Sequence, residues 1–236
     1  MEIRNMEIDK NKWEFHSYQE FSKKVDIEKI DTSLFECNSE WPNAMYAIHK
    51  GDFHVDGSFD INKFFQTLNN DLSQSISDFD FVYIVWIQGN MVVKNSMYTE
   101  DEEDMTTSFV VEGDLSSKSV VVGGTRLQVL GNLKTDTVFY LTGAEACIIY
   151  KEPFNGKLFY NFTMALGTKT LLRDNADSLV EINETNHNLL IDSLDMDILE
   201  KIDEEDDESE FNEDEFVVDE EAAVSFLIAG KSLFRK

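Results

Sequence analysis

The chain contains few cysteines and few prolines, and both shortages exclude certain kinds of fold. Its two cysteines, Cys37 and Cys147, follow no metal-binding or redox spacing. They predict neither a disulfide-stapled secreted domain nor a zinc site, and they favour a reducing compartment. The two prolines, Pro42 and Pro153, fall outside the predicted strands, as the hydrogen bonding of a β-sheet requires.

Long apolar runs are also absent. No run approaches the roughly 18 apolar residues that a transmembrane helix needs. The first residues, Met1 to Glu7, contain no apolar stretch of the kind that a secretory signal peptide has. We therefore expect a cytoplasmic protein.

Motifs that carry catalysis or bind cofactors are missing from the sequence. The four histidines, His16, His49, His54 and His187, include no pair with the spacing of a helical zinc site. We interpret them as structural residues. No nucleophile elbow, phosphate-binding loop, dinucleotide fingerprint or calcium loop is present. The sequence predicts a protein that is not an enzyme and binds no cofactor or metal.

Positive charge is scarce, with 20 basic residues against 47 acidic ones and a net charge of −27. Such a field repels nucleic acid and anionic membrane surfaces and attracts basic proteins. It also keeps a protein soluble without any partner. A 42% share of apolar residues, with 18 phenylalanines, indicates that the chain nevertheless folds.

A short motif recurs along the middle of the chain: glycine, then aspartate or asparagine, then an apolar residue. It begins at Gly51, Gly89, Gly113 and Gly131, and the last two glycines lie 18 residues apart in similar surroundings. A strand, a tight turn and another strand that return at a fixed period are typical of a stacked-coil β-solenoid.

Short runs rich in Val, Ile, Phe and Tyr surround these motifs and predict strands. They are 79–87, 91–93, 109–111, 119–122, 127–130, 137–141, 146–150 and 158–164. Gly123, Gly124, Gly131, Gly143 and Gly156 then mark corners, where we expect glycine to supply a positive φ.

Two architectures fit the predicted strands. Asp56-Gly57 and Asn155-Gly156 are hairpin signals and leave an antiparallel β-sandwich as the alternative. The repeat at Gly113 and Gly131 favours a right-handed parallel β-helix, in a mainly β protein with helical caps. Between the strands, residues 62–77 have helical spacing and predict a helix packed against the coils.

The segment Val110 to Met164 resembles the bactofilin-related, "polymer-forming" bacterial β-helix proteins. The motifs that carry this resemblance begin at Val111, Val120 and Leu127, and Gly51 to Gly57 fits the same pattern. The resemblance implies a right-handed parallel β-helix. Because the period drifts and insertions interrupt it, we expect an irregular, capped member that is a monomer or a small closed oligomer.

The sequence divides into three parts. Residues 1–45 predict a cap of helix and loop, with an amphipathic helix between His16 and Ile30. Residues 46–182 form the predicted β-helix core. Residues 183–236 predict an acidic helical segment packed on the solenoid. Ile191, Leu194, Ile198 and Ile202 lie on one face of a first predicted helix, with Asp192 or Ser193 as its possible N-cap, and a second helix is predicted over 220–229.

Acidic residues concentrate in two runs. Between Asp192 and Glu221 there are 17 acidic residues and one basic residue, Lys201, a net charge of −16. Aromatic residues interleave with the acids there, as in interfaces where aromatic anchors lie within a charged rim. The predicted partner-binding residues are Glu100, Asp101, Glu102, Glu103, Asp104, Asp203, Glu204, Glu205, Asp206, Asp207, Glu208, Glu210, Phe211, Glu213, Asp214, Glu215 and Phe216.

These features predict a non-enzymatic acidic protein that binds a basic protein. An immunity protein that occludes the active groove of a nuclease-type toxin is the most economical example, because such a groove is itself basic. One alternative is a self-assembling scaffold, as in bactofilins. The other is a glycan-active enzyme that uses aspartates of one solenoid face: Asp52, Asp56, Asp60, Asp114 and Asp136. The simplest interpretation of those aspartates is turn chemistry, in which the side chain caps backbone N–H groups.

Overall fold

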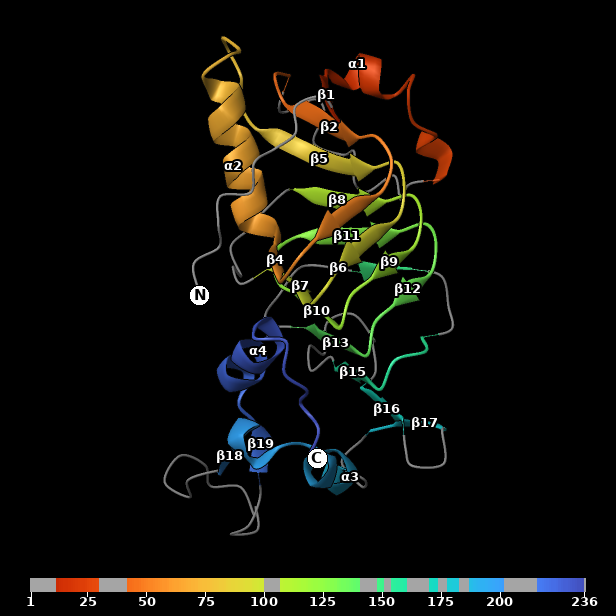
Figure 1. Ribbon diagram of the computed structural model, residues 1–236, viewed down its shortest axis with the longest axis vertical. Coiled ribbons are helices and arrows are strands. Elements are labelled where there is room, and N and C mark those ends of the chain that lie inside the picture. Colours follow the sequence, from red (N-terminus) through yellow and green to blue (C-terminus); the bar gives the residue numbers. More distant parts are fainter. Residues whose placement is uncertain are drawn as a thin grey trace.

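The computed structural model describes residues 12–29, 42–99, 107–140, 148–150, 154–160, 170–173, 178–182, 187–201 and 216–235. This part of the chain is mainly β, with a few short helices (Figure 1). No helix within it is long and apolar enough to cross a membrane. Both cysteines lie outside the described residues.

Three sheets contain nearly all the strands. Sheet A has the order β1 (Trp13–His16), β2 (Met45–His49), β5 (Val82–Ile87), β8 (Ser108–Val111), β11 (Arg126–Val129) and β14 (Ile148–Ile149). Sheet B has the order β12 (Leu133–Lys134), β9 (Leu115–Ser116), β6 (Met91–Val93) and β3 (Phe53–Val55). Sheet C has the order β17 (Leu179–Glu181), β16 (Leu171–Arg173), β15 (Leu158–Tyr160), β13 (Thr137–Tyr140), β10 (Ser119–Val122), β7 (Ser96–Tyr98) and β4 (Phe59–Asp60).

The chain visits the sheets in a fixed order. It passes from sheet A to B to C as β2, β3 and β4, and then repeats the order as β5–β7, β8–β10 and β11–β13. We call each pass through the three sheets a coil. Every ladder between equivalent strands of these passes is parallel. The antiparallel sandwich is therefore wrong for the strands of these four passes, β2–β13. The Asp56-Gly57 signal is a corner between β3 and β4, and it makes no hairpin.

Apolar side chains of equivalent strands stack in columns inside the three sheets. In sheet A the column contains Ala47, Val85, Phe109, Leu127 and Ile148. Sheet B contributes Phe53, Met91, Leu115 and Leu133, and sheet C contributes Phe59, Met97, Val120, Val138 and Phe159. All but the partly buried Phe53 are buried members of one core, and burial of each large apolar side chain contributes about 2 kcal/mol.

The outer face of sheet A is also apolar, and the N-terminal segment covers it. Phe21, at the end of α1 (Tyr18–Phe21), packs against Tyr46 and Trp86 with ring centroids 4.8 and 6.0 Å away. The 3₁₀ turn η1 (Ile27–Lys29) lies beside this cluster. The single helix predicted between His16 and Ile30 is wrong in extent, because His16 belongs to strand β1 and the described residues after it form two short helical pieces, α1 and η1.

Helix α2 (Ile61–Ser73) begins directly after β4. The Asp60 side chain caps it by accepting a hydrogen bond from the Lys63 amide at 2.9 Å. Its apolar face, including Phe65 and Leu68, is fully buried against the core. The helix predicted over 62–77 is thus present and ends at Ser73.

The C-terminal part contains α3 (His187–Ser193), the 3₁₀ turn η3 (Met196–Ile198), an antiparallel pair of strands β18 (Leu199–Lys201) and β19 (Phe216–Val218), and α4 (Glu220–Ile228). The helix predicted through Ile191 to Ile202 is wrong. The chain leaves the helix at Leu194 because Leu194 bridges to Phe234 and the Asp195 amide donates to the carbonyl of Leu233.

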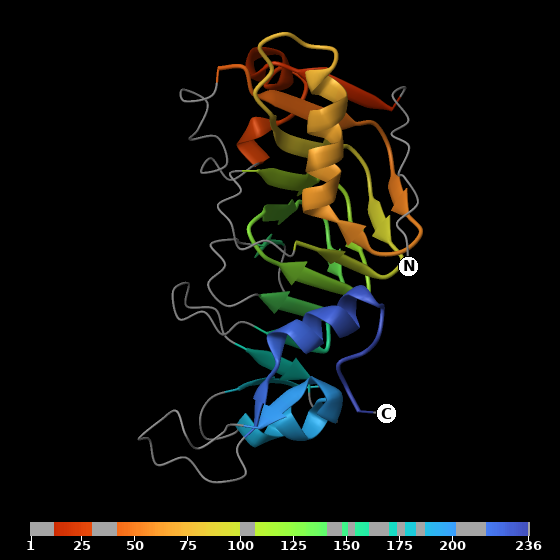
Figure 2. The same ribbon diagram turned by 90° about the vertical axis from the view of Figure 1, so that its left-hand side faces the viewer.

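Helix α4 matches its prediction over 220–229. Asp219 caps it through the Ala222 amide, and Gly230 follows it with a φ of +71°. The helix contacts β7 and β10 of sheet C. The hydroxyls of Ser58 and Ser96 donate to the carbonyls of Ile228 and Leu227, which lie in its last turn. Figure 2 shows α2 along the upper strands and α4 across the lower ones, on the same side of the stack.

Candidate functional site

The glycines of the repeat stack directly on one another at the corner between sheets A and B. A Cβ atom on Gly89 would lie 2.5 Å from the backbone of Gly51, and one on Gly131 would lie 2.4 Å from that of Gly113. Of these, only Gly51 has a positive φ, of +80°. The expectation of a positive φ at Gly131 and Gly156 is therefore wrong. Glycine is required there because the neighbouring coil leaves no room for a side chain.

The next residues of the repeat, Asp52, Asn90, Asp114 and Asn132, form a hydrogen-bonded ladder. The backbone amide of Asn90 donates to the side-chain oxygen Oδ1 of Asp52 at 2.7 Å, and the backbone amide of Asp114 donates to Oδ1 of Asn90 at 2.9 Å. The backbone amide of Asn132 donates to Oδ1 of Asp114 at 2.9 Å. The expected capping of backbone N–H groups occurs, but the amide belongs to the following coil. Each side chain thus ties one coil to the next.

Asp114 also carries the one ion pair of this ladder. Lys134 donates to its carboxylate at 2.6 Å. The hydrogen bond from Lys134, followed by those from Asn132, lowers the pKa of Asp114 from 3.8 to about 2. Asp114 is therefore ionised at any physiological pH and is unsuited to be a catalytic acid.

The aspartates of the glycan-enzyme alternative are divided among several positions. Asp52 and Asp114 are in the ladder, Asp60 caps α2, and Asp56 and Asp136 follow β3 and β12 at the corner between sheets B and C. Among the residues that the structure describes, no group of three or more His, Cys, Asp or Glu side chains is placed to hold a metal ion.

The histidines have separate environments. Nδ1 of buried His49 lies 3.1 Å from the Gly51 carbonyl, and its ring packs edge-on against Trp13 and Phe53. His16 lies 3.1 Å from the carboxylate of Glu14, and His54 is exposed on sheet B. The packing of His49 fits the structural role predicted for it.

The predicted partner-binding residues lie outside the described part of the chain, apart from Phe216, whose backbone begins β19. The structure does place the residues that flank them. Lys201 pairs with Phe216 in the β18–β19 ladder, so the two ends of segment 202–215 lie side by side. Residues 100–106 connect sheet C to sheet A, between β7 and β8.

The described residues carry 21 acidic and 15 basic side chains, a net charge of −6, whereas the whole chain carries −27. The sheets and the elements that cover them are therefore close to electrical balance. Most of the negative charge belongs to the remaining segments, of which 100–106 and 202–215 are the most acidic.

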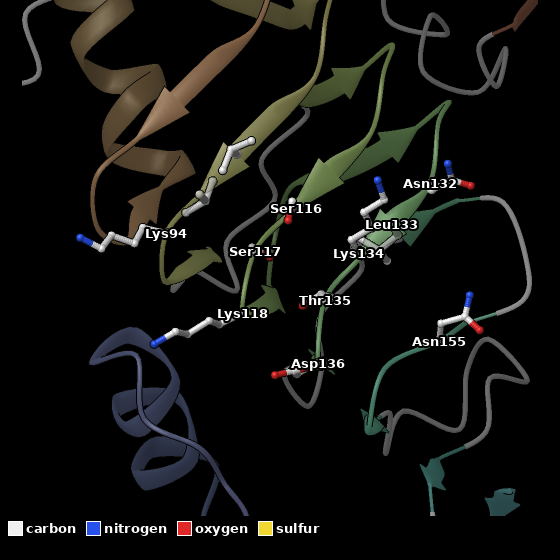
Figure 3. A pocket seen from close by; sticks show the side chains of 12 residues that line it. Lys94, Ser116, Ser117, Lys118, Asn132, Leu133, Lys134, Thr135, Asp136 and Asn155 are labelled. Carbon is white, nitrogen blue, oxygen red and sulfur yellow. The ribbon is translucent and has the colours of Figure 1, made fainter. Parts of the chain in front are cut away.

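A shallow hollow of about 660 Å³ lies along sheet B and the corner that leads to sheet C (Figure 3). Three lysines line it, Lys94, Lys118 and Lys134, with Asp136 as the one carboxylate among its lining residues. Sequence reasoning missed this surface. A signal was available, because Lys94, Lys118 and Asp136 each stand five positions after a repeat glycine.

Comparison of the chain with protein-family models, with curated proteins and with solved structures finds no match. The function must therefore be argued from the chain's own sequence and structure.

Proposed function

We propose that the three sheets are the faces of a right-handed parallel β-helix of the kind that the resemblance to bactofilin-related proteins implies. The parallel ladders and the repeated order of sheets support this. The glycine stack and the Asp–Asn ladder at one corner support it as well, because one residue type recurs at one place in each coil.

On this scaffold the protein is a non-enzymatic, cytoplasmic binding protein for a basic protein. An immunity protein that neutralises a nuclease-type toxin is the most economical form of this function. The observation that carries the proposal is the uneven distribution of charge, with −6 on the described residues and −27 on the whole chain. The scaffold carries a net charge of −6, so its folding does not require the large excess of acidic residues in the remaining segments.

The physical mechanism is electrostatic. A nuclease holds its substrate in a basic groove, and acidic segments that mimic phosphate charge occlude it. A field of this size raises association rates with a basic partner by about 10- to 1,000-fold. The β18–β19 pair gives segment 202–215 a fixed base on the scaffold, which limits the conformational freedom lost on binding.

Self-assembly through sheet edges is less well supported. Strand β1 pairs antiparallel on the outer edge of β2, and β16 and β17 add antiparallel strands beyond β15. These added strands interrupt the parallel series at one end of sheet A and one end of sheet C. A capped stack of this kind favours a monomer or a small closed oligomer.

The test compares two variants that lose the same number of charges. In the first, the six acids from Asp203 to Glu208 become Asn or Gln. In the matched control, six acids of the scaffold are replaced in the same way: Glu20, Glu28, Asp56, Asp71, Asp78 and Asp80. Each protein is co-expressed with the toxin candidate encoded by the neighbouring gene, and growth and co-purification at low and high salt are measured.

The wild type and the control are expected to restore growth and to retain the basic partner at low salt. The 203–208 variant is expected to restore growth poorly and to retain little of the partner even at low salt, because its association rate falls roughly tenfold or more. Equal loss in both variants would reduce the proposal to a general charge effect, and retention of full activity by the 203–208 variant would refute the role of that segment.

A further inference from the structure

A second hollow adjoins the lysine-lined one and carries charge of the same sign. The two share Lys118 and Asp136, and the second adds Lys157, Lys231 and the ring of Phe234. We call the joined surface the lysine groove. Five of the 15 basic residues in the described part of the chain line it, but only one of the 21 acidic ones does.

The corner between sheets B and C builds the middle of the lysine groove. The backbone amide of Lys118 donates to the carbonyl of Asn95 at 2.8 Å. In the same way, the amide of Asp136 donates to the carbonyl of Lys118 at 3.0 Å, and the amide of Lys157 donates to the carbonyl of Asp136 at 2.6 Å. These residues therefore occupy one position in successive coils, about 4.8 Å apart. The backbones of Lys118 and Lys157 are about 10 Å apart by this spacing.

The C-terminal segment closes one side of the groove. Helix α4 ends at Ile228, and Gly230 turns the chain so that Lys231 and Phe234 reach the second hollow. Lys118 contacts the Gly230 carbonyl at 3.4 Å, which joins the two walls.

Most of these lysines have no carboxylate partner. Lys134 pairs with Asp114 at 2.6 Å. Among the described residues, the other four ammonium groups lie within 4 Å of no carboxylate. Lys157 and Lys231 instead face the rings of Phe234 and Phe226, at 5.9 and 4.3 Å. Their charge therefore remains available to a ligand.

We propose that the lysine groove binds a small organic or inorganic oligoanion with two or more closely spaced anionic groups, either carboxylates or phosphates. The spacing of the corner lysines suits such groups, because one ligand can contact ammonium groups on alternate coils. A long polyanion does not suit it. It would extend beyond the groove over the surface of a chain with a net charge of −27, which repels it.

The experiment measures binding of tripolyphosphate and of citrate to the full-length chain by calorimetry at low salt. The test variant is Lys94→Gln with Lys157→Gln, since neither side chain makes an ion pair with a described residue. The matched control is Lys23→Gln with Lys63→Gln, two exposed lysines that do not line the groove. Circular dichroism checks that all three proteins are folded.

We expect at least one probe to bind the wild type and the control equally, and the groove variant about tenfold more weakly for each lysine lost. Binding of tripolyphosphate alone assigns a phosphate ligand, and binding of citrate alone a carboxylate ligand. The proposal is wrong if neither probe binds at millimolar concentration, or if the control loses as much affinity as the groove variant. It is also wrong if a 20-nucleotide single-stranded DNA binds as tightly as the probes.

This result is independent of the basic-partner test, because the lysine groove and the acidic segments carry opposite charge and are changed by different variants.

Discussion

The stacked glycines allow a sharp test of how the coils are held together. In Gly131→Ala the new Cβ would lie 2.4 Å from both C and O of Gly113 and 2.7 Å from the Asp114 amide nitrogen. All three atoms belong to the backbone of the neighbouring coil, so no side chain can rotate away to relieve the contact. One coil must move, and this weakens the hydrogen bond from Asn132 to Asp114.

The expected loss of stability follows from these contacts. Forcing a methyl group into a closed site costs about 3 kcal/mol, and weakening one ladder hydrogen bond costs about 1 kcal/mol. Lower entropy of the unfolded chain offsets about 1 kcal/mol. The net loss is about 3 kcal/mol, which corresponds to a fall in Tm of about 6–12 °C for a chain of this length.

Gly51→Ala is the control for this prediction. No atom lies within 4 Å of its added Cβ, and the only cost is a φ of +80°, about 1 kcal/mol. Urea unfolding followed by tryptophan fluorescence measures both variants. If Gly131→Ala is no less stable than Gly51→Ala, the coils do not approach as closely as the stack requires, and the explanation of the repeat by close packing fails.

Three further predictions concern stability. The pKa of Asp114 is about 2 in the folded protein, against 3.8 for the ordinary group. Its stabilising effect is therefore complete above pH 3.8 and is lost as pH falls toward 2. Urea titrations across this range should show that the free energy of unfolding falls less steeply in Asp114→Asn than in the wild type. Leu227→Ala removes a buried side chain of α4 and should lower the free energy of unfolding, measured by thermal unfolding, by about 2–5 kcal/mol. Leu189→Ala, at a half-exposed site, should change it by less than about 0.5 kcal/mol. Equal losses in the two variants would contradict the docking of α4. Phe21→Ala should cost about 3–5 kcal/mol and shift the tryptophan emission to the red, because Phe21 packs against Trp86; unchanged emission would count against that contact.

Local features of the sequence predicted β5, β6, β8, β10, β11, β13, β14 and β15, but they did not predict β1–β4, β7, β9, β12 or β16–β19. The Gly–Asp/Asn–apolar motif marks the corner between sheets A and B in each pass, because glycine and an amide-binding side chain are both needed at that place. Strand pairing was harder to predict. Asp56-Gly57 has the composition of a hairpin turn, but its neighbours pair with the next coil, a partner that lies dozens of residues away.

Features that depend on distant partners were missed. The apolar spacing of Ile191, Leu194 and Ile198 is helical, yet the helix ends because Leu194 pairs with Phe234 near the other end of the segment. The lysine groove depends on Lys231, which reaches Lys118 only after α4 has crossed sheet C. Neither contact has a local signature.

The ladders limit how many acidic residues the stacked coils can hold. Two carboxylates at one position of adjacent coils would lie about 4.8 Å apart and repel by about 1 kcal/mol in water and about 3–4 kcal/mol near a protein surface. The A–B corner avoids this by alternating Asp52, Asn90, Asp114 and Asn132. The B–C corner avoids it by placing Asp136 between Lys118 and Lys157. A stack of coils therefore accepts acids only when neutral or basic residues separate them. Of the 47 acidic residues of the chain, 26 lie outside the described residues.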